Sequence, residues 1–212
     1  MINTEIEARE FIQALGSTDD AIAKLELLSA RLREENELQN LVARPTLNTI
    51  WQRHIADSAQ LLRHCDPDTL SDPWLDLGSG AGFPGLVIAV LKPGLPVILV
   101  ESRKRRVTWL ATMVEELGLT NCRIEGGRLE ELDTFQAGVI SARAFAPLQR
   151  LLRLSARFST SRTRWLLPKG RSAAQEVRDL PKSAASMFHV EQSLTDADAG
   201  IVVGTGRWKA GS

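Results

Sequence analysis

The sequence predicts an α/β fold, in which a mostly parallel sheet carries helices on both faces and is preceded by a helical extension. From residue 74 onward, short apolar runs alternate with stretches of helical length, and this alternation is typical of a parallel sheet covered on both sides. Before that point, apolar residues recur at helical spacing. The 212 residues correspond to about one domain and an extension, at roughly 150 residues per domain. We expect a helical cap, residues 1–66, on a domain of residues 67–212, together forming one compact unit.

The extension is expected to hold three helices. Thr4 and Glu7 have the spacing of a capping box, which begins a helix, and Gly16 ends it. A second, amphipathic helix is predicted by apolar residues three or four positions apart, namely Ile22, Leu25, Leu28 and Leu32. The third helical stretch is expected at 48–64, after the break at Arg44-Pro45.

The remaining segments are assigned by length, by β-branched content and by the glycines and prolines that end them. Strands are expected at 74–77, 97–101, 122–125, 139–141 and 164–167. Helices are expected at 83–91, 104–117, 148–158 and 173–179. Two last runs, 187–192 and 201–203, are expected to pair as a closing hairpin.

Composition excludes several classes of protein. The longest apolar run, 86–91, is far shorter than the ~20 residues of a membrane span. The acidic N-terminus, 1–7, lacks the basic and apolar regions of a signal peptide. Cys65 and Cys122 are 57 positions apart, with no CxxC and no histidine at metal spacing. We therefore expect a cytoplasmic, metal-free protein with reduced thiols and no membrane contact.

The charge is zero overall but unevenly distributed. Residues 1–40 carry nine acidic and four basic side chains, whereas residues 141–182 carry ten basic and two acidic ones. A further basic run, Arg-Lys-Arg-Arg, occupies 103–106. This polarity favours a surface that binds an anionic partner. The alternative is a set of solvated helix faces whose charges happen to cluster.

A glycine-rich turn joins the first sheet strand to its helix, with the sequence Asp76-Leu-Gly78-Ser-Gly80-Ala-Gly82-Phe-Pro-Gly85. Phe83 stands where a dinucleotide-binding GxGxxG has its third glycine, and no GK[ST] follows to make a P-loop. Glu101 ends the second strand, where a carboxylate can accept hydrogen bonds from both hydroxyls of a ribose. The order of strand, Asp76, GxGxG, helix, strand and Glu101 predicts an S-adenosylmethionine (SAM) site. Otherwise the glycines only form a turn and Glu101 is a surface acid.

Several further motifs are those of a known family, and they stand at Arg53-His-Ile-Ala-Asp-Ser58, Asp76–Gly85, Glu101-Ser-Arg-Lys-Arg105, Arg128-Leu-Glu-Glu131, Ser141-Ala-Arg-Ala-Phe-Ala-Pro147 and Pro168-Lys-Gly170. From about residue 40 to 203 the chain resembles the bacterial RsmG (GidB) family, which methylates guanine N7 in 16S ribosomal RNA. The resemblance implies a Rossmann-like, SAM-dependent methyltransferase. It also implies SAM contacts at Gly78, Phe83, Leu129, Glu130 and Arg143.

Three residues are candidates for positioning the substrate. Arg143 follows the fourth strand, at the sheet edge where such folds bind ligands, and is suited to the SAM carboxylate or to a phosphate. Phe145 is a candidate for stacking on a flipped guanine, or else a core residue. Lys169 follows the fifth strand in the same way, in what is otherwise a plain turn. His54 and Asp57 have the spacing of a relay or metal pair, but hydrogen bonding on a helix surface is the commoner role.

The absence of a Ser-His-Asp or paired-carboxylate pattern is consistent with N7 methylation, because the N7 lone pair carries no proton for a base to remove. We expect no catalytic acid or base, and a monomer acting on 16S rRNA, free or in the small ribosomal subunit. Two alternatives stay open: a SAM methyltransferase of a protein or small molecule, and a SAM- or nucleotide-binding module in ribosome assembly.

Overall fold

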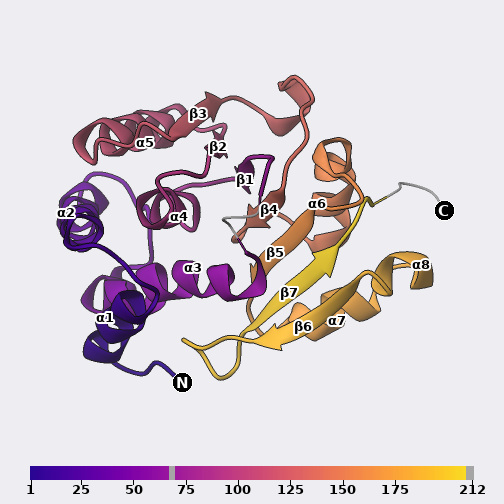
Figure 1. Cartoon of the computed structure of the whole chain (residues 1–212), viewed down its shortest axis with the longest axis horizontal. Coiled ribbons are helices and arrows are strands. Elements are labelled where there is room, and N and C mark those ends of the chain that lie inside the picture. Colours follow the sequence, from indigo (N-terminus) through magenta and orange to yellow (C-terminus); the bar gives the residue numbers. More distant parts are fainter. Residues whose placement is uncertain (67–69, 209–212) are drawn as a thin grey trace.

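The computed structural model describes residues 1–66 and 70–208 and contains one sheet of seven strands (Figure 1). The strands are β1 (Trp74–Leu77), β2 (Val97–Glu101), β3 (Cys122–Gly126), β4 (Val139–Ala142), β5 (Arg164–Lys169), β6 (Phe188–Gln192) and β7 (Gly200–Thr205). Their order is β3-β2-β1-β4-β5-β7-β6, with β1 to β5 parallel. Strand β7 runs antiparallel to both β5 and β6. The predicted α/β fold and closing hairpin are confirmed.

Helices cover both faces of the sheet because successive strand residues point to opposite sides. Trp74 and Leu99 face a core shared with the N-terminal helices and with α4 (Gly85–Leu91) and α5 (Lys104–Glu116). Leu75 and Val100 face a second core. It is formed with α6 (Leu148–Ser155), η6 (Ala156–Phe158), α7 (Ala173–Arg178) and α8 (Lys182–Ala185). Two short elements, α8 and η5 (Leu129–Glu131), were not expected from the sequence.

The first two helices of the extension form as expected. The capping box of Thr4 and Glu7 begins α1 (Glu5–Ala14), and Gly16 follows its end with a φ of 79°. Helix α2 (Asp19–Asn36) buries Leu25, Leu28 and Leu32.

The third stretch is not the regular helix expected over 48–64. It is a succession of η1 (Arg44–Thr49), the π-helical η2 (Trp51–Ala56), α3 (Asp57–Ala59) and η3 (Gln60–His64). Pro45 lies in the first turn of η1 instead of ending the helical pattern. The backbone N–H groups of Trp51 and Gln52 donate to the carboxylate of Glu5 at 3.1 and 2.8 Å. A contact with α1 therefore satisfies these groups, which a local pattern does not reveal.

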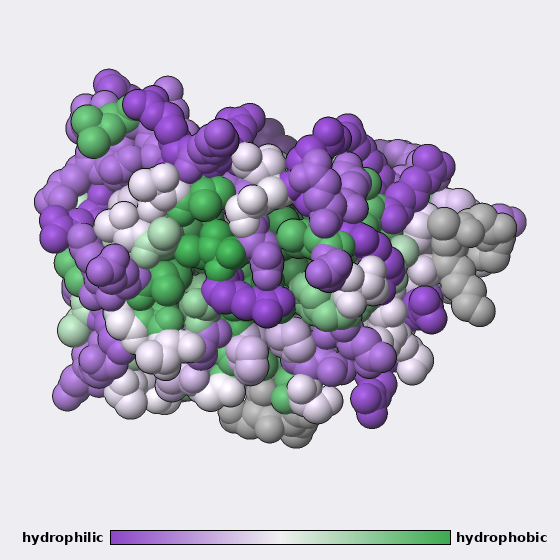
Figure 2. Space-filling model, turned by 90° about the horizontal axis from the view of Figure 1, so that it is seen from above, coloured by the Kyte–Doolittle hydropathy of each residue, from purple (hydrophilic) through white to green (hydrophobic). Residues whose placement is uncertain are grey.

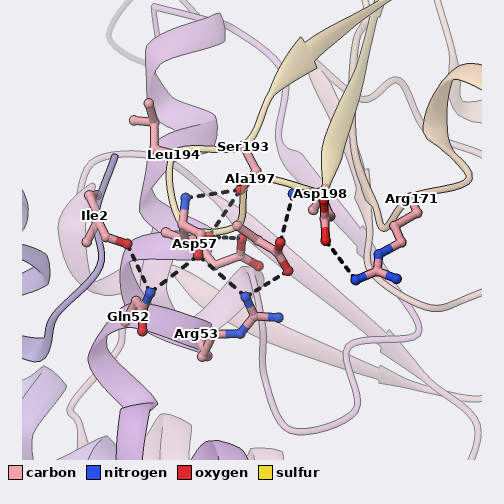
Figure 3. Close-up of polar contacts among 12 residues, drawn as sticks. Ile2, Gln52, Arg53, Asp57, Arg171, Ser193, Leu194, Ala197 and Asp198 are labelled. Carbon is pink, nitrogen blue, oxygen red and sulfur yellow. Dashed lines mark hydrogen bonds and ion pairs between the residues drawn. The ribbon is translucent and has the colours of Figure 1, made fainter.

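The extension is joined to the sheet by polar contacts with the loop between β6 and β7, shown in Figure 3. The Arg53 guanidinium pairs with Asp196 at 2.9 Å, and the Thr195 hydroxyl donates to Asp57 at 2.7 Å. Leu194 N–H donates to the Gln60 side chain at 2.7 Å. Residues of the extension and of the sheet also share one hydrophobic core. The expected boundary at 66/67 adjoins residues 67–69, which lie outside the described residues.

Figure 2 shows one face of the molecule, on which a hydrophobic patch lies among hydrophilic residues. Among the described residues, no helix has the length and apolar character needed to cross a membrane. Both cysteines are free thiols, and burial raises the pKa of Cys65 to about 11 and that of Cys122 to about 12.

Candidate active site

The glycine-rich turn lies at the carboxyl end of β1 and needs glycine for its backbone. Gly78, Gly80 and Gly82 have φ values of 65°, 58° and 99°, which side chains disfavour. At Gly78 there is also no room, because a Cβ would lie 2.6 Å from Cδ2 of Phe145. The aromatic ring of Phe145 thus packs directly on the turn.

Asp76 holds this turn in place from beneath. Its side chain is fully buried and accepts hydrogen bonds from the Ser141 hydroxyl at 2.7 Å and from Gly85 N–H at 3.3 Å. The Trp74 indole N–H in turn donates to the Ser141 hydroxyl at 2.8 Å. Burial raises the pKa of Asp76 to about 6, despite these hydrogen bonds.

Glu101 ties the turn to the end of β2. One carboxylate oxygen accepts from Gly80 N–H at 3.0 Å, and the other accepts from Arg103 N–H at 2.8 Å. The Arg106 guanidinium lies 3.9 Å from the carboxylate. A carboxylate has about four lone-pair sites, so each oxygen keeps capacity for one further donor.

Beside Glu101 lies a cavity of about 310 Å³, at the carboxyl edge of the parallel strands. Of the SAM-contacting residues expected from the sequence, Gly78, Glu101, Leu129 and Glu130 line it. Asp76, Gly80, Phe83 and Arg143 are not among its lining residues. The Glu101 carboxylate, with free lone pairs, suits the ribose hydroxyls of SAM, and two glycines, Gly78 and Gly127, line the same cavity, so the residues present fit this cofactor.

A second cavity, of about 680 Å³, adjoins the first. The two share Ala144, Phe145 and Ala146 as a common wall. The three candidate positioning residues, Arg143, Phe145 and Lys169, all line the second cavity, as do Thr46, His54 and Asp57 from the extension. The sequence did not link the extension to this cavity, because the segments involved lie far apart along the chain.

The common wall is a strained loop held at both ends. Ala144 has a φ of 55°, unusual for a residue other than glycine. On one side, Arg143 donates to His54 Nδ1 at 3.1 Å and lies 3.6 Å from the Asp57 carboxylate. On the other side, the Lys169 ammonium donates to the carbonyl of Ala146 at 2.8 Å, and Glu176 binds the same ammonium.

His54 and Asp57 do not form the relay pair that their spacing suggested. Both side chains contact Arg143 instead, and no hydrogen bond joins the two side chains within the described part of the chain. His54 is buried, and burial, followed by the positive charges of Arg143 and Arg53, lowers its pKa to about 3. No group of three metal-ligating side chains occurs within residues 1–66 and 70–208.

Basic side chains surround the first cavity. Arg103, Lys104 and Arg105 of the predicted basic run are exposed at the start of α5. The cavity lining includes four arginines, Arg103, Arg106, Arg128 and Arg150, which come from three separate segments. The sequence showed their charge, but only the fold brings Arg128 and Arg150 to the same opening as Arg103.

The chain is similar in sequence to proteins of one named family. A family model described as "rRNA small subunit methyltransferase G" matches residues 21–201. Two relatives with the name ribosomal RNA small subunit methyltransferase G are similar over most of the chain. The one from Erythrobacter litoralis is 58% identical, over 99% of this chain and 100% of the relative. The one from Novosphingobium aromaticivorans is 53% identical, over 95% of this chain and 88% of the relative.

Solved structures agree on the fold. An RNA methyltransferase from Salinibacter ruber in complex with S-adenosyl-L-homocysteine has a TM-score of 0.54 at 18% identity, over 72% of this chain and 91% of its own. A mutant of MtNAS in complex with S-adenosylmethionine also has a TM-score of 0.54, at 16% identity, over 96% of this chain and 78% of its own. At such identities the likeness concerns the architecture alone.

Proposed function

The chain belongs to the GidB family, the rRNA small subunit methyltransferases G, and from this premise we propose that it transfers a methyl group from SAM to N7 of a guanine in 16S rRNA. The observation that carries the proposal is the pair of adjoining cavities at the carboxyl edge of the sheet, one beside the glycine-rich turn and Glu101. The family favours this function over the protein, small-molecule and binding-module alternatives.

In the first cavity, this chain's residues bind and orient the cofactor. Glu101 accepts hydrogen bonds from the ribose hydroxyls with its remaining lone pairs, while Gly80 N–H and Arg103 N–H hold the carboxylate still. Gly78, Leu129 and Glu130 line the same cavity. Asp76, Gly80 and Phe83 support this site through the turn they belong to. SAM, when bound, supplies a methyl group activated on a positively charged sulfur.

In the second cavity, Phe145 and Arg143 orient the target nucleotide. Phe145 presents a half-buried ring suited to stacking on a base that has left its helix. Arg143 faces this cavity, which favours a phosphate or base partner over the cofactor carboxylate. Lys169 holds the wall between the two cavities in place, because its ammonium is already bound to the Ala146 carbonyl and to Glu176.

No residue of this chain is required to move a proton. Guanine N7 attacks with a free lone pair, so positioning the two reactants is the main contribution, an effect worth up to ~7–11 kcal/mol. Burial lowers the pKa of His54 to about 3, so its ring stays neutral at the working pH, and both ring nitrogens are already engaged, Nδ1 with Arg143 and Nε2 with Thr46.

We further propose a cytoplasmic monomer that needs no metal and acts on 16S rRNA, free or within the small subunit. The exposed basic residues around the first cavity support binding of the RNA phosphates.

The test is incubation of the protein with methyl-labelled SAM and either small-subunit rRNA or whole small subunits from a strain that lacks the enzyme. The modified base is then mapped. We expect label on one guanine, at N7. Label on protein, or on another base position, would contradict the proposal, and binding of SAM without transfer would favour the binding-module alternative.

A further inference from the structure

Three segments that are distant in the sequence meet at His54. Its ring stacks on Phe83 of the glycine-rich turn, with 5.1 Å between centroids and 21° between planes. The Arg143 guanidinium lies 5.2 Å from the centroid of the same Phe83 ring. His54 is 6% exposed and Phe83 is 2% exposed, so both contacts are made away from bulk solvent. The N-terminal extension thereby touches both the turn and the wall between the cavities.

The hydrogen-bond partners of His54 determine where its proton lies. An arginine side chain only donates, so His54 Nδ1, which is 3.1 Å from the Arg143 guanidinium, must accept. The proton therefore sits on Nε2, which donates to the Thr46 hydroxyl at 2.7 Å. That hydroxyl donates to the carbonyl of Ala43, also at 2.7 Å. Each group in this series of hydrogen bonds, from Arg143 to Ala43, has a partner. The series is complete only when His54 is neutral and carries its proton on Nε2.

We propose that His54 is a positioning residue for methyl transfer: it holds the Arg143 guanidinium toward the second cavity through Nδ1, and Thr46 holds His54. The proposal rests on the proposed function, in which Arg143 orients the target nucleotide. An arginine side chain has several rotatable bonds, and its other polar contacts here are looser, at 3.6 Å to Asp57 and 3.4 Å to the Arg53 carbonyl. The contact with His54 is the shortest of the three.

A pair of variants separates this role from simple packing. His54→Phe keeps an aromatic ring to stack on Phe83 but removes the acceptor. His54→Asn loses the ring but keeps an oxygen close to the place of Nδ1, where it can accept from Arg143. If His54 only fills space, His54→Phe will be as active as the wild type and His54→Asn will be the more damaging change.

We expect the reverse order. In single-turnover methylation of small-subunit rRNA with saturating SAM, His54→Phe should lose about tenfold or more in rate, and His54→Asn about threefold or less. The SAM dissociation constant should be the same in His54→Phe and the wild type, since His54 does not line the first cavity and the variant keeps a ring to stack on Phe83. Equal rates for His54→Phe and the wild type would overturn the proposal.

A double-mutant cycle tests whether His54 acts through Arg143. In an Arg143→Ala background, His54→Phe should cause no further loss, because the group it positions is gone. A further tenfold loss there would overturn the proposal.

Thr46→Val is the second variant, should thermal melting show that His54→Phe is unfolded. Thr46→Val removes the hydrogen bond between the Thr46 hydroxyl and His54 Nε2 and leaves the His54 ring in place. It should lower the rate in the wild-type background only, and a wild-type rate for Thr46→Val would again refute the role. Failure of wild-type protein to methylate rRNA would instead refute the proposed function.

Discussion

The sharpest test of the cofactor cavity is Glu101→Gln. This change keeps the size of the side chain but removes its charge and replaces one acceptor oxygen by an NH₂ donor. Glu101 is 5% exposed, and each of its oxygens already accepts one backbone N–H, so an NH₂ group will face either Gly80 N–H or Arg103 N–H. A hydrogen bond to a charged group contributes about 1.5–3 kcal/mol. Losing one of two such bonds to the ribose should therefore weaken SAM binding by about 10- to 150-fold.

Calorimetric titration with SAM measures this loss, and thermal melting of each variant shows that the fold is kept. Glu125→Gln is the matched control. Glu125 lies on the adjacent strand β3, pairs with Arg123 at 3.3 Å and is absent from the lining of the cavity. It should bind SAM with wild-type affinity. An affinity of Glu101→Gln within about twofold of the wild type, in a folded protein, would refute the assignment of the ribose to Glu101.

Three further predictions concern RNA, protons and stability. Replacing exposed Arg103, Lys104 and Arg105 by Ala should weaken rRNA binding. The slope of the logarithm of the binding constant against the logarithm of the salt concentration should fall by up to about 0.7 per lost phosphate contact. An unchanged slope in a filter-binding titration would place the RNA elsewhere. With saturating substrates the rate should be nearly flat from about pH 6 to 8.5, since the pKa of His54 is near 3, and a break near neutrality that disappears in His54→Asn would contradict this. The pKa of Asp76 is raised to about 6 in the fold, so the native state binds more protons than the unfolded one and Asp76 contributes more stability as the pH falls. Relative to Asp76→Asn, denaturant unfolding should show the wild type gaining about 1 kcal/mol between about pH 7.5 and 5, and a loss over that interval would refute the argument.

Local patterns in the sequence were sufficient for most of the fold. Strand β2 and helix α5 lie within a residue or two of their predicted bounds, because β-branched runs and helical periodicity depend on neighbours in the chain. The glycine-rich turn was recognisable for the same reason, since its glycines and Glu101 belong to one short βαβ unit, on successive strands.

Only the tertiary structure decided which residues meet at the site. His54 and Arg143 are 89 positions apart, and nothing local in either segment indicates that one accepts a hydrogen bond from the other. The irregular helical segment over 44–64 likewise depends on the contact with Glu5 from another helix. Residue type and spacing describe what a side chain is able to do, whereas its partner depends on how separate elements pack, and that packing is a property of the whole chain.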